Sequence, residues 1–222
     1  MTVHLATTGA ARTWHERLLS PEEQERARRF VRRQDRERFL VGAALLRLLL
    51  AERLDKDPLE VEVDRTCPTC GRPHWKPRIE TNAIHCSVAH SGPYVLVALR
   101  DEEPIGVDVE ALAPGSAREH EDIHQAVLAP DEPAPRDAAE FLRLWTRKEA
   151  LLKLSGQGLN TPPGSIRLSR DGPPQVLSAP AELTGAVVVD LEIARTAVAA
   201  LATYGPPPLI EIVMAHHQLA AS

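Results

Sequence analysis

The chain has 222 residues, of which 43% are hydrophobic and 26% charged, enough apolar material for one large domain or two small ones with a buried core. Its net charge of −5 and its 4% of aromatic residues argue against a general nucleic-acid-binding protein. No apolar run approaches the roughly 20 residues that cross a bilayer, and residues 1–10 lack the basic-then-apolar pattern of a signal peptide. Three cysteines, an odd number, indicate a reducing cytoplasm rather than a disulfide framework. We therefore expect a cytoplasmic monomer with no membrane partner and no nucleic-acid partner.

A first helix is expected to begin near residue 21, because Ser20 can cap it, Pro21 suits the first helical position and acids follow. The segment from Arg26 to Arg38 then carries seven arginines and two acids. Such a segment is usually a solvated helix face, but the imbalance of charge favours an anionic ligand. The run Phe39–Leu50, which is apolar apart from Arg47, predicts a core helix.

A short strand is predicted at Leu59–Val63, and a cysteine motif follows it. Cys67, Cys70 and His74, with Cys86 further along the chain, could bind zinc. One CxxC is only half of such a site, however. A tight turn with reduced thiols is the simpler interpretation.

The stretch Ile105–Glu110 is predicted to be a strand, because apolar residues alternate with glycine and acids. Asp108 and Glu110 therefore point the same way, with backbones about 7 Å apart. Two carboxylates held so close repel each other unless a cation or a proton lies between them. Such oxygen ligands suit Mg²⁺, although Glu110 could also simply end an exposed strand edge.

The segment Ala138–Leu154 is rich in helix formers and predicts a long helix that the following glycines end. Trp145, Glu149 and Lys153 are spaced four apart and so share one face. An amphipathic helix with a surface ion pair between Glu149 and Lys153 would also explain this spacing.

The rest of the chain is predicted to contain a proline-rich loop, at residues 111–136, and several further strands. We expect the loop to lie on the outside and to meet a partner protein. The further strands are expected at Tyr94–Leu99, Ile166–Leu168, Ala186–Ile193, Ala197–Thr203 and Leu209–Met214.

A faint internal repeat relates the two halves of the sequence. Three similar stretches, which begin at residues 19, 43 and 94, recur in the same order 109, 106 and 102 residues later. Two related α/β units of about a hundred residues would explain the repeat.

Two of these stretches together resemble a known family. The sequence GVDVE at residues 106–110, followed by WTRKEALLK at residues 145–153, resembles the paired signature of the Sfp-type 4′-phosphopantetheinyl transferases. The resemblance implies an α/β (α+β) fold of two similar halves related by a pseudo-twofold axis, with the active site in the cleft between them. We expect the halves to be residues 1–105, with coenzyme A phosphate contacts, and residues 106–222, with the carboxylates and the catalytic helix.

The resemblance also implies a role for each matching residue. The metal, Mg²⁺ with Mn²⁺ as a possible substitute, is expected on Asp108, Glu110 and Glu149, and the catalytic groups are expected to be Glu149 and Lys153. Two further elements, Trp75-Lys76-Pro77 and the stretch around His90, resemble the family's Gly-Lys-Pro and Asn-(Ile/Val)-Ser-His-(Ser/Thr) elements, with Trp75, Ser87 and Ala89 as departures. The expected coenzyme A contacts are Arg38, Lys76, His90, Ser91, Asp108, Lys148 and Lys153, with Arg26 and Arg33 as further candidates.

The activity that the resemblance implies is transfer of phosphopantetheine from coenzyme A to a serine hydroxyl of an apo acyl or peptidyl carrier protein, with release of 3′,5′-ADP. Two alternatives use the same sequence features. A Mg²⁺-dependent hydrolase of nucleotide pyrophosphates would use the same carboxylates but no carrier protein. A nucleic-acid-binding module would use the arginines of residues 26–38.

Overall fold

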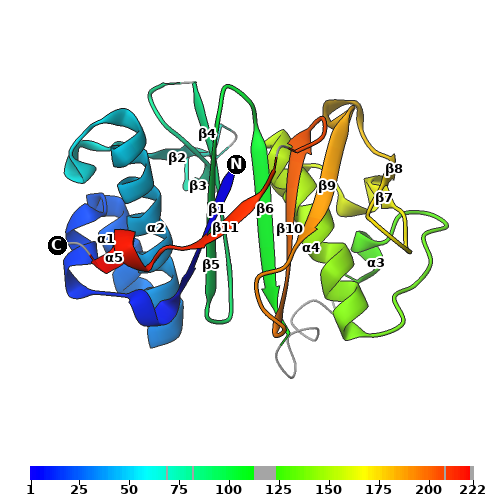
Figure 1. Cartoon of the computed structure of the whole chain (residues 1–222), viewed down its shortest axis with the longest axis horizontal. Coiled ribbons are helices and arrows are strands. Elements are labelled where there is room, and N and C mark those ends of the chain that lie inside the picture. The colour runs from blue at the N-terminus through cyan, green and yellow to red at the C-terminus, as the bar shows by residue number, and fades with distance from the viewer. Residues whose placement is uncertain (69, 82, 113–123, 208, 221–222) are drawn as a thin grey trace.

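The computed structural model describes residues 1–68, 70–81, 83–112, 124–207 and 209–220, without the side chains of His74 and His124. The described chain forms two α/β halves that lie side by side (Figure 1). The first half contains β1 (Thr2–Thr7), α2 (Arg33–Leu54), β4 (Ile84–Ser91) and β5 (Tyr94–Asp101). The second half contains β6 (Ile105–Ala111), α4 (Ala138–Ser155), β9 (Ala186–Leu191) and β10 (Ala197–Tyr204).

The two halves repeat one topology. Each has the order strand, helix, strand, strand, and in each the last strand lies between the other two, as β1-β5-β4 and as β6-β10-β9. All of these neighbours are antiparallel. The two-half architecture expected from the sequence repeat is thereby confirmed.

Further short helices and strands complete the two halves. They comprise α1 (Pro21–Arg29), β2 (Asp64–Thr66), β3 (Pro73–Arg78), α3 (His124–Val127), β7 (Arg167–Leu168), β8 (Val176–Ser178), β11 (Glu211–Met214) and α5 (His216–Ala220). Within the described ranges, no helix combines the length and the apolar character that crossing a bilayer would require.

The helix predictions in the first half hold, but α2 extends beyond both ends of the predicted Phe39–Leu50 run. The Ser20 hydroxyl accepts a hydrogen bond from the Glu23 backbone N–H, and the Glu23 carboxylate accepts one from the Ser20 N–H, which forms a capping box for α1. Helix α2 begins at Arg33, six residues before the apolar run that predicted it. The buried Arg47 in this helix forms an ion pair with Glu23 at 2.6 Å, so one glutamate both caps α1 and ties it to α2.

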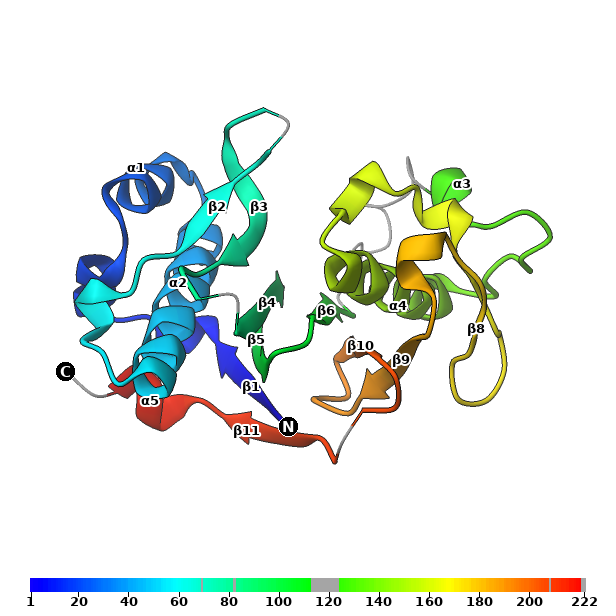
Figure 2. The same cartoon turned by 90° about the horizontal axis from the view of Figure 1, so that it is seen from above.

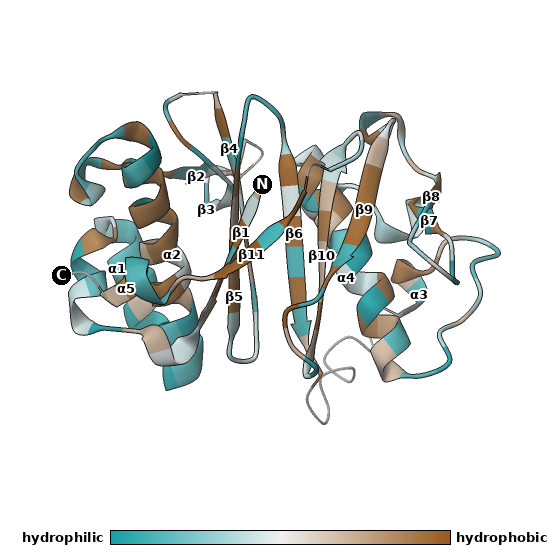
Figure 3. Ribbon diagram, viewed as in Figure 1, coloured by the Kyte–Doolittle hydropathy of each residue, from teal (hydrophilic) through white to brown (hydrophobic). Residues whose placement is uncertain are grey.

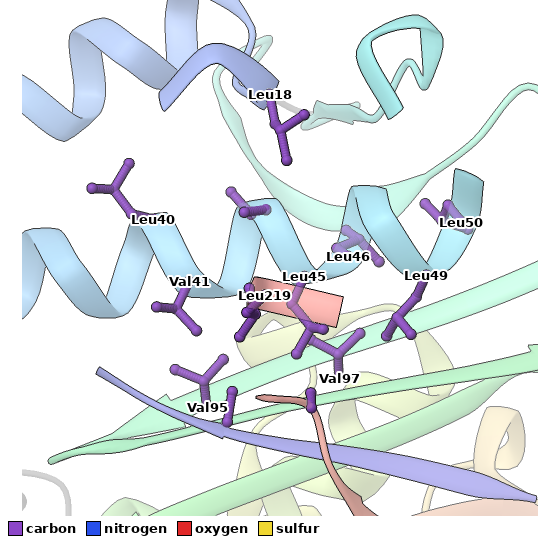
Figure 4. Packing of buried hydrophobic residues seen from close by; sticks show 14 of the residues in the cluster. Leu18, Leu40, Val41, Leu45, Leu46, Leu49, Leu50, Val95, Val97 and Leu219 are labelled. Atoms are coloured by element: carbon purple, nitrogen blue, oxygen red, sulfur yellow. The ribbon is translucent and has the colours of Figure 1, made fainter. Parts of the chain in front are cut away.

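Two apolar layers hold the molecule together. In the first, leucines and valines of α2 pack on Val95 and Val97 of β5 (Figure 4). In the second, Val3 and Leu96 of the first sheet pack against Val107 of the second, so the two sheets share a core between the halves. Figure 3 shows the apolar strands at the centre of the molecule, with polar bands along β6.

Gly106 allows α4 to lie directly on β6. A Cβ atom at this position would lie 1.9 Å from the Ala150 carbonyl oxygen and 2.6 Å from the Leu154 nitrogen. Any side chain there would push the helix away from the strand. The glycine that opens the GVDVE stretch thus brings the carboxylates of β6 close to the polar face of α4.

Two sequence predictions are corrected. The C-terminal segment does not belong to the second half, because β11 pairs in parallel with β1 and α5 packs on α2. Figures 1 and 2 show this red segment returning to the first half. The strand predicted at Leu59–Val63 is also wrong, because Pro58–Glu60 forms a 3₁₀ turn that Pro58 and the Asp57 cap favour.

The returning segment leads to the first prediction. Leu219 is 1% exposed in the core of the first half, so Leu219→Ala should lower the free energy of unfolding by about 2–5 kcal/mol. Leu209, which is 91% exposed, provides the control, and Leu209→Ala should change stability by less than about 0.5 kcal/mol. Denaturant unfolding measures both variants, and equal stabilities would contradict the docking of the tail.

Candidate active site

A cavity of about 390 Å³ lies between the two halves. The first half contributes Trp75, Lys76 and Val88 from β3 and β4 to its wall, and the second contributes Glu149 and Lys153 from α4. The turn that follows α4, at residues 156–160, closes one side of the cavity. Groups from distant parts of the sequence therefore meet in one crevice, as the sequence led us to expect.

Glu149 lies among like charges in this crevice. Burial raises the pKa of its carboxyl to about 7, against the lowering influence of Lys153 and with further raising by Asp108 and Glu110. One of its oxygens, Oε1, is buried and has no hydrogen-bond partner among the described residues. A buried oxygen without a partner is costly, so this carboxyl is suited to a cation or a proton.

Lys153 neutralises part of this negative charge. Its Nζ donates to Asp108 Oδ1 at 2.6 Å. Burial alone would lower the pKa of the ammonium, but Asp108, Glu149 and Glu110 together outweigh that effect and raise the pKa. Lys153 therefore stays charged next to the carboxylates.

Glu110 is held from both halves. Ser91 Oγ donates to its Oε2 at 2.6 Å, and Trp145 Nε1 donates to its Oε1 at 3.3 Å. The Ser91 hydroxyl also accepts the Ala111 N–H at 3.1 Å. The serine belongs to β4 and the tryptophan to α4, so the Glu110 side chain on β6 is bound by one residue of another strand and one residue of a helix.

A basic group of side chains lies on the other side of this region. His90 is exposed at the end of β4, and partial burial together with the charges of Lys153, Arg38 and Arg26 lowers its pKa below the usual value. Arg26 stacks over the Phe39 ring at 5.0 Å, and Arg38 pairs with Asp35. The guanidinium groups of Arg26 and Arg38 suit phosphate oxygens. Arg33, in contrast, points to solvent and pairs with Glu37.

The donor set fits a hard divalent cation. Asp108, Glu110 and Glu149 supply carboxylate oxygens, the ligands that Mg²⁺ prefers, and the partnerless Glu149 oxygen is one available position. As the side chains stand, no three His, Cys, Asp or Glu groups in the described part of the chain are gathered as a metal site. The ammonium of Lys153, bonded to Asp108, occupies part of the carboxylates' binding capacity.

Comparison with known proteins agrees with this geometry. Residues 10–102 match a family model described as the N-terminal part of 4′-phosphopantetheinyl transferase, and residues 104–200 match one for the 4′-phosphopantetheinyl transferase superfamily. The chain belongs to the 4′-phosphopantetheinyl transferase superfamily. The boundary between the two matches coincides with the turn between β5 and β6.

Several curated transferases are similar to this chain. A putative 4′-phosphopantetheinyl transferase of Synechocystis is 36% identical over 153 residues, which cover 66% of this chain and 60% of that protein. A 4′-phosphopantetheinyl transferase of Bacillus subtilis is 31% identical over 163 residues, 69% of this chain and 68% of that protein. The transferase Sfp of Bacillus subtilis strain 168 is 31% identical over 167 residues, 70% of this chain and 69% of that protein.

The structure corrects the role expected for Lys148, which the sequence resemblance placed among the coenzyme A contacts. Lys148 does not face the crevice: it is 0% exposed, and its Nζ donates to the Val127 carbonyl at 2.6 Å and to Glu132. Glu132 also accepts the N–H groups of Ala129 and Leu168. Lys148 lies one residue before Glu149, so it points about 100° away around the helix and fixes α4 to the second half.

Lys76 and Ser91 lie in the expected region but bind protein groups. Lys76 Nζ donates to the carbonyl oxygens of Ile105 and Lys153, both at 2.8 Å, which ties β6 and the end of α4 to the first half. Burial lowers the pKa of this ammonium to about 8. Both hydrogen-bonding functions of Ser91 are engaged by Glu110 and Ala111, as described above.

The cysteine motif forms a turn. Gly71 N donates to Cys67 O at 2.8 Å, and Cys67 N donates to Arg72 O at 2.9 Å. Cys67 is buried and Cys70 is exposed, whereas the side chain of His74 lies outside the described residues. Cys86 is a buried thiol that donates to Pro77 O. The tight turn expected from the sequence is present.

The sequence assigned no role to several residues that line the cavity. Arg65 lines the cavity from β2 but has no motif around it. Ser87, on β4, accepts the Val107 N–H at 3.0 Å and lines the cavity as well. The turn of Gln157 and Leu159 is visible in the sequence only as the end of a helix. Residues 113–123 of the expected partner-binding loop, which spans residues 111–136, lie outside the described residues.

The position of Lys148 leads to a second prediction. Lys148→Met should lower the free energy of unfolding by about 3–5 kcal/mol, because it leaves the charge of the buried Glu132 uncompensated. The double variant Lys148→Met/Glu132→Gln removes that charge and should regain part of the loss. Denaturant unfolding of both variants gives the comparison, and a stable Lys148→Met variant with weakened coenzyme A binding would contradict the structural role.

Proposed function

We propose that the protein transfers the 4′-phosphopantetheine group from coenzyme A to a serine hydroxyl of an apo acyl or peptidyl carrier protein, in a Mg²⁺-dependent reaction that releases 3′,5′-ADP. The observation that carries the proposal is the juxtaposition of Glu149 with the Asp108–Lys153 pair, at a cavity that Glu149 and Lys153 line. Membership of the transferase superfamily supports the same assignment.

The metal would be held by Asp108, Glu110 and Glu149. When bound, Mg²⁺ supplies Lewis-acid polarisation of the pyrophosphate and neutralises part of its charge. The partnerless Oε1 of Glu149 supports its assignment as a ligand. The other two carboxylates lie on one side of β6, which packs against α4.

The basic side chains would bind the phosphates of coenzyme A. The guanidinium groups of Arg38 and Arg26, both of which act electrostatically on His90, can donate to phosphate oxygens. His90, with its lowered pKa, is a neutral imidazole that can donate one N–H. Lys76, which already binds two carbonyl groups next to the cavity, adds positive charge to the same wall.

The chemical step moves one proton and one phosphoryl group. The serine oxygen of the carrier forms a bond to phosphorus as the bond between that phosphorus and the oxygen of 3′,5′-ADP breaks. The Glu149 carboxylate would accept the proton of the serine hydroxyl. Lys153 places an ammonium next to the reacting phosphate, where it stabilises developing negative charge.

Incubation with coenzyme A, Mg²⁺ and an apo carrier protein tests the proposal. A mass gain on the carrier equal to one phosphopantetheine group is the expected result. Coenzyme A cleaved without any modified carrier would instead favour the pyrophosphate hydrolase. No change in either molecule across several apo carriers, with a known transferase as positive control, would overturn the proposal.

Asp108→Ala should slow the transfer by about 3–5 kcal/mol of activation free energy, with each ~1.4 kcal/mol equal to a tenfold change in rate. The variant loses a metal ligand and leaves Lys153 without its ion-pair partner. Asp101→Ala is a matched control, because Asp101 forms an exposed ion pair with Arg53. Steady-state rates of the two variants should differ widely, and near-native turnover of Asp108→Ala would reject the assignment.

Glu149→Gln should reduce turnover at least about 100-fold, because an amide cannot accept the serine proton. Its thermal stability without metal should be equal to or above that of the wild type, because the neutral side chain no longer repels Asp108 and Glu110. Calorimetric unfolding in the presence of a chelator measures stability. A destabilised variant would show that the carboxylate serves the fold rather than the reaction.

A further inference from the structure

We propose that Ser91 is a positioning residue: its hydroxyl orients the Glu110 carboxylate for the divalent metal and does not contact coenzyme A. This inference deepens the proposed function and rests on it, because it assumes that Glu110 is a metal ligand. It departs from the role that the sequence resemblance implied for Ser91.

The hydrogen bond between Ser91 and Glu110 is short and charge-assisted. Ser91 Oγ lies 2.6 Å from Glu110 Oε2, within the range of a hydroxyl donating to a carboxylate. A serine hydroxyl has a single proton to donate, and this bond uses it. The same oxygen accepts the Ala111 N–H at 3.1 Å, which fixes the direction of the hydroxyl.

Trp145 completes the support of the same carboxylate. Its Nε1 donates to the other oxygen of Glu110 at 3.3 Å. Each oxygen of the Glu110 carboxylate accepts one of these two bonds, and together they orient the carboxylate. Glu110 is therefore held in one orientation by one donor from each half of the molecule.

The backbone next to Ser91 is shaped for this close approach. Gly92 adopts a φ of 51°, and a Cβ atom at this position would lie 2.6 Å from the Ala111 Cβ. Only glycine lets the end of β4 come so near to the end of β6. Since Ser91 is the last residue of β4, this approach brings its hydroxyl to Glu110.

Groups that orient a metal ligand set the affinity for the metal. Loss of such an outer hydrogen bond typically weakens metal affinity about 10- to 100-fold. Ser91→Ala should therefore weaken Mn²⁺ affinity by about tenfold or more, whereas coenzyme A affinity measured without metal should not change. Ser91→Thr retains the hydroxyl and should restore most of the metal affinity.

The experiment titrates Mn²⁺ into the full-length protein with coenzyme A present and no carrier, so that no transfer occurs. The signal of free Mn²⁺ in electron paramagnetic resonance gives the metal affinity, with coenzyme A alone as the blank. Calorimetry with coenzyme A in a chelator gives the second affinity. Ser87→Ala is the matched control, because it removes a hydroxyl that accepts the Val107 N–H and that donates to no carboxylate in the described contacts.

Each outcome decides the matter. Weaker Mn²⁺ binding in Ser91→Ala, unchanged in Ser87→Ala and recovered in Ser91→Thr, supports the positioning role. Weaker coenzyme A binding with unchanged Mn²⁺ binding would overturn it and make Ser91 a substrate contact. Equal loss of Mn²⁺ binding in both alanine variants would also overturn it, because the loss would then come from a general disturbance of the contact between β4 and β6. A wild-type protein that binds no Mn²⁺ would refute the metal assignment itself, a failure distinguishable from these.

Discussion

The outer edge of β6 is the feature on which the arrangement of the molecule depends. β6 is an edge strand of the second sheet, yet it is buried against the first half, so its outward backbone groups need partners. Side chains of the first half provide them: Lys76 donates to the Ile105 carbonyl, and Ser87 and Ser91 accept the N–H groups of Val107 and Ala111. The two halves are joined by side chains at this edge, and the same strand carries Asp108 and Glu110 towards α4.

The contact of β6 with the first half explains why the charged groups can be buried next to it. The apolar core between the sheets, with Val107 and Leu96, stabilises the union of the halves by burial of hydrophobic surface. That stability offsets the burial of the carboxylates and the repulsion among them, which both raise the pKa of Glu149. Lys153 reduces the repulsion further through its bond to Asp108. Unfavourable charge therefore remains in the site, and a bound metal ion and phosphate can neutralise it, as is common in catalytic sites.

Three lysines illustrate how packing assigns different roles to one residue type. Lys153 faces the carboxylates, Lys76 ties backbone carbonyls of the second half to the first, and Lys148 is buried on the opposite side of α4 with Glu132. The spacing of Lys148 and Lys153 along α4 already predicts that they lie roughly half a turn apart around the helix. Which face of α4 meets β6 was decided by the close approach at Gly106.

The sequence by itself determined the two-half architecture, the main helices and strands, and the family, because these depend on local periodicity, capping and the motifs at residues 106–110 and 145–153. It also brought forward Asp108, Glu149 and Lys153, since residues four apart on a helix and two apart on a strand share a face. Only the tertiary structure decided that the C-terminal segment returns to β1, that Lys148 is structural and that Ser91 bonds Glu110. These contacts join residues distant in the chain, and whether a polar group meets a ligand or another protein group depends on which surfaces pack together.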